Sequence, residues 1–464
     1  MPVRKRKLLL NLSYAFLAQG VSLLLNVLVS LIVPRVFSVV DFNFWQLFIF
    51  FTGYGGMLHL GLNDGVYLRF GGEKYEELDH ATLGAQLKVS FFMQMLLGFA
   101  VVAVAFFFTQ NTTRFFVVCA AVLYAILANL SLFFGLLFRA TNQIKRFAKF
   151  NLLYTTFLIV SVTALLVLQI HRVYWLIVLH IVAQAVALIY AAFCGRQLLQ
   201  SKHVPLGRAL KETLRNVKIG FHLMVALTLG TLILGVGRGL MDVHWGIEVF
   251  GRVSFALLLI KLFLVFVNQI GFVLFPVLRR FEEKEQRHFY LKARKLLLFY
   301  LPLLLLFYHP LRWFVMRWLP AYAESLPFMA VLFPLCVFEG RMKLLSTTYL
   351  KLLRKEKVML KINALAALLS AALSVLGIWL FDDVMMVVGL MVVAMLVRAL
   401  LADVYLAKQL KVQVGMSFVF EVLLVLLFTV VTVLKTPALS VSLFLVGYGV
   451  YLFFIHRLHR GEKA

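Results

Sequence analysis

Polar side chains recur at helical spacing inside four strongly apolar stretches of this chain. The members are Gln19, Ser22, Asn26 and Ser30, with Asn11 before them; Trp45, Thr52, His59 and Asn63; Thr228, Thr231, Gly235 and Arg238; and Ser254, Lys261 and Asn268. Spacings of three, four or seven residues put the members of each stripe on one face of a helix. Such groups can line a polar cavity, or they can hold membrane helices together by packing and hydrogen bonds.

Lys261 carries the strongest chemical implication of these residues. It lies about 12 Å inside the outer end of its apolar stretch, at 1.5 Å per helical residue. A Lys in mid-membrane costs about 2.5–3.5 kcal/mol, so we expect it to face water or an anion. Snorkelling of its long side chain towards the membrane surface is the alternative. Arg238 and Arg69 follow their stretches on the outer and the cytoplasmic side, and we expect them to serve the two mouths of a cavity. For Arg398 we expect a structural role, paired with Asp403.

Several chemistries lack the residues that they need. The acidic residues in or near apolar stretches are few, Glu339, Asp403 and Glu421, and none lies on the four stripes. No G-x-x-x-x-G-K-[ST] loop is present, so the chain does not hydrolyse a nucleotide itself. No His, Cys and Asp residues have metal-ligand spacing. We therefore expect no cofactor and no metal, and no enzyme activity.

The elements that position these residues are membrane helices. At 63% apolar residues and a mean hydropathy of +0.95, the chain has more apolar surface than a soluble core can hide. About 20 apolar residues span the hydrocarbon layer. We predict 14 spans: 8–32, 42–62, 84–108, 115–137, 151–169, 173–194, 218–237, 249–275, 294–309, 326–346, 358–380, 384–406, 417–434 and 438–456.

Positive charge alternates along the connections between these spans. Most of the 46 Lys and Arg residues fall in every second connection and in the start of the chain, including Arg4-Lys5-Arg6-Lys7. By the positive-inside rule, both ends then lie in the cytoplasm. The net charge of +26 is explained by anionic lipid at the cytoplasmic face, so we expect no nucleic-acid partner. We predict a multi-pass membrane protein with both ends in the cytoplasm, acting as a monomer.

A weak repeat divides the chain. Arg139, Lys145, Lys149-Phe150-Asn151 and Leu153 recur 212 residues later as Lys351, Lys357, Lys361-Ile362-Asn363 and Leu365. Because six spans separate the copies, the two halves keep the same orientation in the membrane. We predict an all-α protein with a six-helix lobe over 1–195, a cytoplasmic linker over 196–217, a second six-helix lobe over 218–410 and a helix pair with a tail over 411–464. The polar stripes fall on the first two spans of each lobe, which favours a cavity between the lobes.

Four segments resemble those of bacterial polysaccharide exporters of the multidrug/oligosaccharidyl-lipid/polysaccharide superfamily. They are residues 34–50 (PRVFSVVDFNFWQLFIF), 59–72 (HLGLNDGVYLRFGG), 250–256 (FGRVSFA) and 273–278 (VLFPVL). The chain departs from the pattern at Asn43, where many members have Gly, and at Gly237, where many have Asp. The interior of its first span has no Arg, unlike that of lipid II flippases, which argues against peptidoglycan precursors as cargo.

The resemblance implies a flippase that moves undecaprenyl-pyrophosphate-linked oligosaccharide by alternating access. Lys261, assisted by Arg238 or Arg69, would meet the diphosphate, and the Gln, Asn, Ser, Thr and His side chains of the stripes would meet sugar. A gradient of H⁺ or Na⁺, or the membrane potential, would drive transport. The expected partners are membrane lipids, a glycan polymerase and glycosyltransferases. A drug or cation antiporter of the same fold, a lipid II flippase and a membrane glycosyltransferase, polymerase or ligase remain the alternatives.

Overall fold

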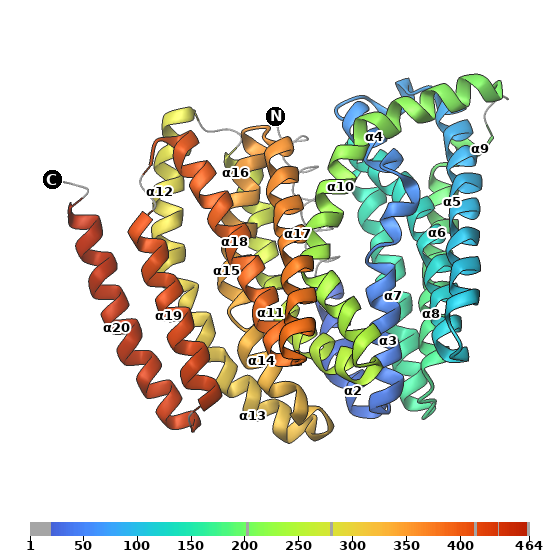
Figure 1. The fold of residues 1–464 in the computed structure, drawn as a ribbon. Helices are drawn as coiled ribbons and strands as arrows, with labels where there is room; N and C mark the ends of the chain where they lie inside the picture. Colours follow the sequence, from blue (N-terminus) through green and yellow to red (C-terminus); the bar gives the residue numbers. More distant parts are fainter. Residues whose placement is uncertain (1–19, 201–203, 279–281, 413–414, 435, 462–464) are drawn as a thin grey trace. The chain divides into compact units, whose positions relative to one another are not determined.

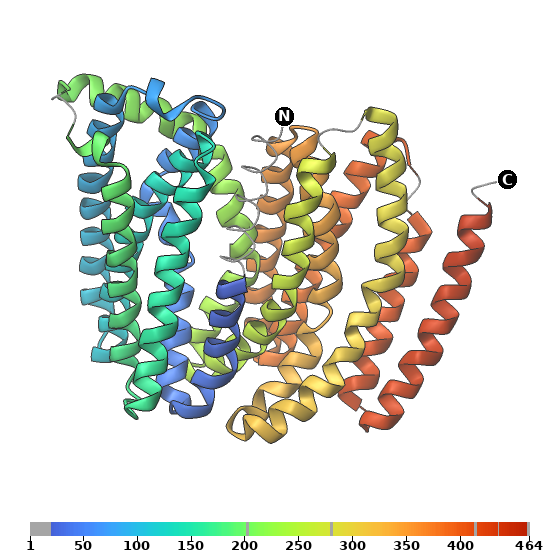
Figure 2. The same ribbon diagram turned by 180° about the vertical axis from the view of Figure 1, so that it is seen from behind.

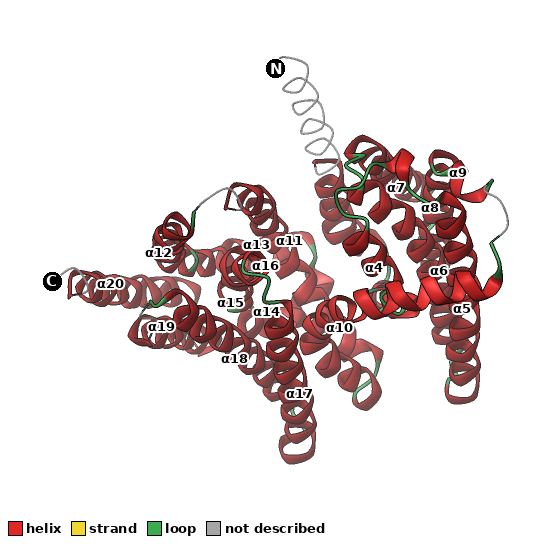
Figure 3. Cartoon of the chain, turned by 90° about the horizontal axis from the view of Figure 1, so that it is seen from above, coloured by secondary structure: helices red, strands yellow, loops and turns green. Residues whose placement is uncertain are grey.

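All regular structure in the described part of the chain is helical. A computed structural model describes residues 20–200, 204–278, 282–412, 415–434 and 436–461, and Figure 3 shows helices joined by short loops in these ranges. The chain divides into two compact units, Met1–Thr228 and Leu229–Ala464. The predicted all-α membrane fold is therefore confirmed.

The first unit is built from one long-helix bundle and several short elements. Its elements are η1 (Leu28–Ile32), α2 (Val33–Val36), α3 (Val39–Thr52), η2 (Gly55–His59), α4 (Leu62–Arg69), η3 (Tyr75–Glu77), α5 (His80–Phe108), α6 (Thr112–Ala140), α7 (Ile144–Val167), α8 (Val173–Cys194), α9 (Arg196–Leu199) and the first part of α10 (Leu206–His244). Helix α6 packs against α3, α5, α7 and α8 (Figures 1 and 2), and its Phe133 and Phe138 are fully buried. On α5, Phe107 is 80% exposed and Phe108 is 84% exposed, as suits a lipid-facing surface.

The second unit contains the rest of α10 and the remaining helices. They are α11 (Ile247–Leu278), α12 (Glu283–Tyr300), η4 (Pro302–Phe307), α13 (Tyr308–Trp318), η5 (Pro320–Ser325), α14 (Leu326–Leu332), α15 (Leu335–Arg341), η6 (Met342–Ser346), α16 (Thr347–Leu352), α17 (Glu356–Phe381), α18 (Val384–Leu410), α19 (Gly415–Leu434) and α20 (Pro437–Gly461). Helices α17 and α18 pack side by side, as do α19 and α20 (Figure 1). Helix α11 packs against α14, α15 and η6.

Short polar residues set the starts of several long helices. Asp79 accepts hydrogen bonds from the Thr82 N–H at 3.0 Å and from the Thr82 hydroxyl at 2.7 Å at the start of α5. Asn111 caps α6, and Asp383 caps α18, in each case by accepting from an N–H group three residues later. A side-chain oxygen in this position satisfies an N–H group that has no partner within the helix. These caps explain why the helices begin where the apolar runs begin.

The described residues contain ten helices long and apolar enough to cross a membrane, or 11 when a bent pair is counted as one span. The prediction of 14 spans is not confirmed. The first predicted span begins in residues outside the described ranges, and the second is divided among α3, η2 and α4. The predicted span 294–309 lies within a longer helical stretch, Lys284–Trp318.

Helix α10 occupies much of the segment that was predicted as a linker. Of residues 196–217, four form α9 and those from Leu206 onwards form the start of α10. Helix α10 then continues without interruption to His244, across the boundary between Thr228 and Leu229. The two units are thus joined through a helix of 39 residues.

Candidate functional site

The polar stripe of the first span is only partly within the described residues. Gln19 lies outside them. Ser22 and Asn26 lie on an apolar helix, Gly20–Val36, in which Asn26 is exposed and Ser22 half-buried. The Asn26 amide donates to the Ser22 carbonyl at 2.8 Å, one turn earlier. The spacing therefore does place these two residues on one helical face.

The second predicted stripe does not lie on one helix. Helix α3 ends at Thr52, whose hydroxyl donates to the Ile49 carbonyl at 3.0 Å, and the chain then forms the 3-10 turn η2. Leu60 and Gly61 adopt left-handed conformations before α4 begins. His59 is buried, its Nδ1 accepts from the Gly61 N–H at 3.0 Å, and its Nε2 lies 4.0 Å from Asp64. The prediction of a continuous polar face was wrong because the α-helix ends at Thr52 and the backbone becomes left-handed at Leu60 and Gly61 before α4 begins.

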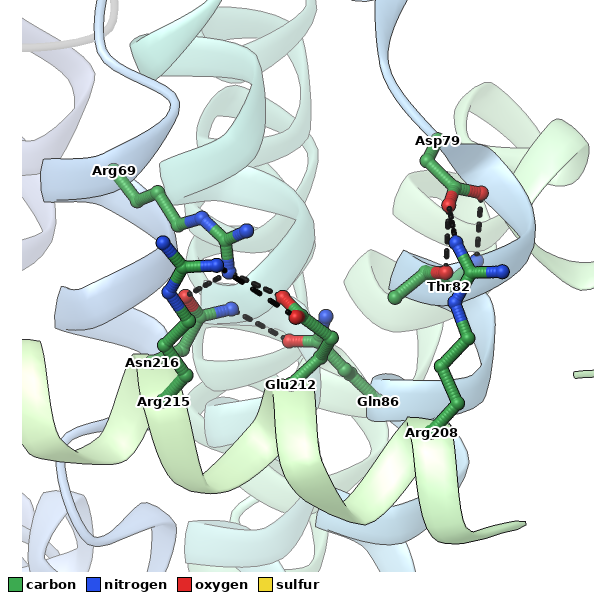
Figure 4. Close-up of polar contacts among 8 residues, drawn as sticks. All are labelled: Arg69, Asp79, Thr82, Gln86, Arg208, Glu212, Arg215 and Asn216. Carbon is green, nitrogen blue, oxygen red and sulfur yellow. Dashed lines mark hydrogen bonds and ion pairs between the residues drawn. The ribbon is translucent and has the colours of Figure 1, made fainter. Parts of the chain in front are cut away.

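Arg69 belongs to a polar network in the first unit, drawn in Figure 4. Its guanidinium donates to Glu212 at 2.6 Å and to Asn216 at 3.2 Å, both on the first part of α10. The Asn216 amide donates in turn to Gln86 of α5 at 2.6 Å. A second link joins Arg208 to Asp79 at 3.2 Å. Arg69 is thus bound to protein carboxylate and amide groups, and it holds α10 against α4 and α5.

Glycines allow this close approach of α4 and α10. A Cβ on Gly65 would overlap the backbone of Asn216, and one on Gly220 would overlap the backbone of Gly61 and Gly65. Gly61 also needs its left-handed conformation, with φ of 88°. Only glycine fits these three positions without displacing a backbone.

The seventh and eighth predicted spans correspond to parts of α10 and to α11. Thr231 is exposed, whereas Arg238 is buried and its Nε donates to the Leu234 carbonyl at 3.3 Å. On α11, Ser254 is 2% exposed and its hydroxyl has no hydrogen-bond partner within the described ranges. The side chain of Asn268 lies outside the described residues.

Lys261 is an exposed cation in the middle of α11. It makes no ion pair with any residue that the structure describes, and the charges of Arg238 and Lys343 are close enough to act on it. All three residues belong to the second unit. Since like charges repel, this group of cations favours an anionic ligand.

Three further polar residues lie close to this group, and the sequence stripes did not include them. Glu339 of α15 pairs with Arg398 of α18 at 2.9 Å and with Lys343 of η6 at 3.6 Å. The Arg398 Nε donates to the Asn363 amide oxygen of α17 at 2.9 Å. The sequence identified Glu339 and Arg398 as charges inside apolar stretches but did not place them near Lys261; the same signal applies to Lys343, which falls within 326–346 and was not singled out.

The predicted pairing of Arg398 with Asp403 was wrong. Asp403 instead pairs with Arg341 at 3.2 Å and accepts from the Ser346 hydroxyl at 3.1 Å. Arg341 also pairs with Glu421 of α19. Five residues advance a helix by about 140°, so Arg398 and Asp403 point to different sides of α18. Arg341 and Glu339 are therefore the centres of two separate charged networks in this unit, and the network around Arg341 is the more deeply buried.

Metal-binding groups are missing from the described part of the chain, where no three His, Cys, Asp or Glu side chains lie close enough to share an ion. The donor set near Lys261 is dominated by Lys and Arg, which bind anions.

Comparison with known proteins gives a match in structure alone. No family model matches the sequence, and no curated protein matches it. The solved structure "Lipid II flippase MurJ, inward closed conformation" is similar over 98% of this chain and 100% of that chain, with a TM-score of 0.65 and 13% identity.

Multidrug transporters are also similar to this chain. An inward-facing MATE family transporter of the MOP superfamily matches over 85% of this chain and 94% of its own, with a TM-score of 0.54 and 12% identity. A MATE protein in complex with MaL6 matches with a TM-score of 0.55 and 13% identity, over 85% of this chain and 93% of its own. This chain is a multi-pass helical membrane protein with the fold of the multidrug/oligosaccharidyl-lipid/polysaccharide superfamily of transporters.

Proposed function

We propose that this protein is a flippase for lipid-linked oligosaccharides in a bacterial inner membrane. The cargo would be a sugar unit on undecaprenyl diphosphate, destined for O-antigen, capsule or exopolysaccharide, and alternating access of a central cavity would carry it to the outer leaflet. The observation that carries the proposal is Lys261, an exposed cation without a carboxylate partner among the described residues, in the middle of an apolar helix. A cation in this position is costly unless it meets water or an anion, and a lipid diphosphate supplies the anion.

Four of the remaining predicted site residues have a role in this proposal. Arg238 adds charge near Lys261, and the exposed Asn26 and Thr231 offer hydrogen bonds to sugar hydroxyls. Arg69 is assigned a holding role instead, because Glu212 and Asn216 already occupy its guanidinium. Transport outward would move negative charge across an inside-negative membrane, which is favourable by about 2.3 kcal/mol per charge per 100 mV. The membrane potential would therefore help to drive transport, alongside a coupled H⁺ or Na⁺ gradient, and the proposal includes no cofactor.

A drug or cation antiporter is the second candidate, and the likeness to multidrug transporters supports it. Exchange of cationic drugs for protons or Na⁺ needs a carboxylate that is free to bind the ion. Glu339 is a carboxylate near Lys261, but Arg398 and Lys343 both pair with it. The excess of cations at this position therefore favours an anionic cargo.

The test uses a cell whose surface glycan depends on this gene. We expect Lys261→Ala to abolish or strongly reduce glycan at the surface, with lipid-linked glycan accumulating inside. Lys295→Ala, which removes an exposed Lys from α12, is the matched control. Unchanged export by Lys261→Ala at equal protein level would remove Lys261 from the mechanism. Increased sensitivity to cationic drugs on deletion, with normal glycan, would favour the antiporter, and arrest of peptidoglycan synthesis would point to lipid II as cargo.

A further inference from the structure

The span that carries Glu339 and Lys343 is broken and irregular. Helices α14 and α15 are separated by Pro334, and the two parts of this span are bent by 51°. Helix α15 then passes into the π-helix η6, Met342–Ser346. Proline interrupts helical hydrogen bonding, and π-helical turns occur frequently at functional sites. Interrupted helices in the membrane mark the binding sites of many transporters, so this irregular span is a candidate to contact cargo.

Side chains from four elements meet at this span. Glu339 of α15 lies between Arg398 of α18, at 2.9 Å, and Lys343 of η6, at 3.6 Å. Helix α17 contributes Asn363, which orients the Arg398 guanidinium. The exposed fractions of the side chains rise from 9% for Arg398 through 16% for Glu339 to 31% for Lys343. The ion pairs are therefore partly accessible, unlike those of Arg341, whose side chain is 1% exposed.

Lys261 connects this cluster to the proposed cargo site. Helix α11 packs against both α15 and η6, and the charge of Lys343 acts on Lys261. Helix α10 also lies beside this cluster, because a Cβ on its Gly230 would come within 3.4 Å of both Asn363 and Arg398. The cluster thus lies beside the cation that carries the proposed function.

The formal charges of the cluster leave an excess of positive charge. Lys261, Lys343 and Arg398 are three cations, and Glu339 is one carboxylate, so the net charge is +2. On α10, Arg238 and Asp242 are one turn apart and contribute opposite charges, which leaves this balance unchanged. A diphosphate esterified at both ends keeps one negative charge on each phosphorus. It therefore matches the excess charge of the cluster.

We propose that Lys343 and Arg398 bind the diphosphate of the cargo together with Lys261, and that Glu339 is an internal counter-ion which the diphosphate displaces. This inference rests on the proposed function, since it places part of the same cargo. Without cargo, Glu339 pairs with two of the three cations, offsets one positive charge and so reduces their repulsion of Lys261. When a diphosphate arrives, its oxygens replace the Glu339 carboxylate on Lys343 and on Arg398. Release of the diphosphate is aided because Glu339 competes for the same two cations.

Binding of dimethyl diphosphate, the smallest diester of this kind, tests the proposal directly. The full-length protein is purified in detergent, and the dissociation constant is obtained from the rise of the unfolding midpoint with ligand concentration. We expect Lys343→Gln and Lys261→Gln each to weaken binding by roughly tenfold or more, as for the loss of a charge-assisted hydrogen bond. Glu339→Gln removes the competitor and is expected to tighten binding several-fold.

A purely structural role for Glu339 predicts a different effect of Glu339→Gln on diphosphate binding. If its ion pairs only hold the fold, Glu339→Gln weakens binding or leaves it unchanged, and either result overturns the proposal. Where Glu339→Gln fails to fold, Glu339→Asp serves instead, because the shorter side chain keeps the charge but loosens its hold on Arg398; it is expected to tighten binding to a smaller degree. Lys408→Gln removes an exposed Lys from the same helix as Arg398 and is the matched control, with no change in binding expected. Dimethyl phosphate, with a single charge, should bind more weakly than the diphosphate in every variant.

Glycan export in cells separates this inference from the proposed function. One outcome is that glycan export depends on the protein while substitutions of Lys343 and Glu339 leave diphosphate binding unchanged. This outcome refutes the inference but not the proposed flippase function. The expected pattern of binding in a protein that exports no glycan refutes the flippase and retains the diphosphate site for another cargo.

Discussion

Replacement of Arg341 by Met tests the energetic role of the buried charge network in the second unit. The side chain of Arg341 is 1% exposed, and those of its partners Asp403 and Glu421 are fully buried. Its guanidinium also lies over the Phe418 ring, 4.9 Å from the centroid. Removal of one partner from a buried pair costs about 3–5 kcal/mol, because the other charge is left without compensation. Arg341→Met leaves the buried carboxylates of Asp403 and Glu421 without their ion-pair partner, and Arg294 is then the remaining cation of the network.

Thermal unfolding of the purified protein in one detergent measures this cost. For a unit of this size, a loss of 3–5 kcal/mol corresponds to a fall in the unfolding midpoint of about 10 °C. The double variant Arg341→Met/Glu421→Met restores the balance, since Arg294 and Asp403 then remain as one cation and one carboxylate. We therefore expect the double variant to be more stable than Arg341→Met alone. A midpoint within about 2 °C of the wild type for Arg341→Met, or a double variant that is less stable than the single one, refutes the reasoning.

Two further changes test the junction between α4, α5 and α10. Gly220→Ala should destabilise the protein by about 1–3 kcal/mol because its methyl group meets the backbone of α4, whereas Gly207→Ala on the same helix meets no atom within 4 Å and should be neutral or slightly stabilising in thermal unfolding. Hydrogen bonds from Thr82, assisted by Arg208, hold the pKa of Asp79 below its usual range. The stabilisation from its charge is therefore present above about pH 4 and is lost as the pH falls through the lowered pKa. Asp79→Asn should reduce stability near neutral pH and have little effect in strong acid; an equal effect at both pH values would contradict the assignment.

The helical architecture followed from the sequence because long apolar runs leave a membrane chain few alternatives. The caps at Asp79, Asn111 and Asp383 were equally local, since each acts on an N–H group three residues away. The break after Thr52 was not predicted. Hydropathy averages over a window and does not detect the residue at which the backbone leaves the α-helix.

The candidate site was predictable only in part. Lys261 was identifiable from its own neighbours in the sequence, because a charge in the middle of an apolar helix is unusual. The pairing of Glu339 with Arg398 joins residues 59 positions apart and depends on how α15 and α18 pack. Periodicity describes the faces of one helix and carries no information about which face meets a neighbour. For the same reason, Asp403 was assigned to Arg398, which is near in sequence, instead of to Arg341.

The pairing of Arg341 with Glu421 also bears on how the protein is synthesised. The segment 326–346 leaves the ribosome with Glu339, Arg341 and Lys343, and each charge near the middle of a nascent segment opposes insertion by about 2.5–3.5 kcal/mol. Glu421 is translated 80 residues after Arg341. The segment therefore depends on later helices to complete its charge pairing, and a chain that stops short of α19 leaves Arg341 with Asp403 of α18 as its one remaining carboxylate partner among the described residues. We expect chains truncated in this way to be less stable in the membrane than chains that include α19, because half of the buried carboxylate pairing of Arg341 is then missing.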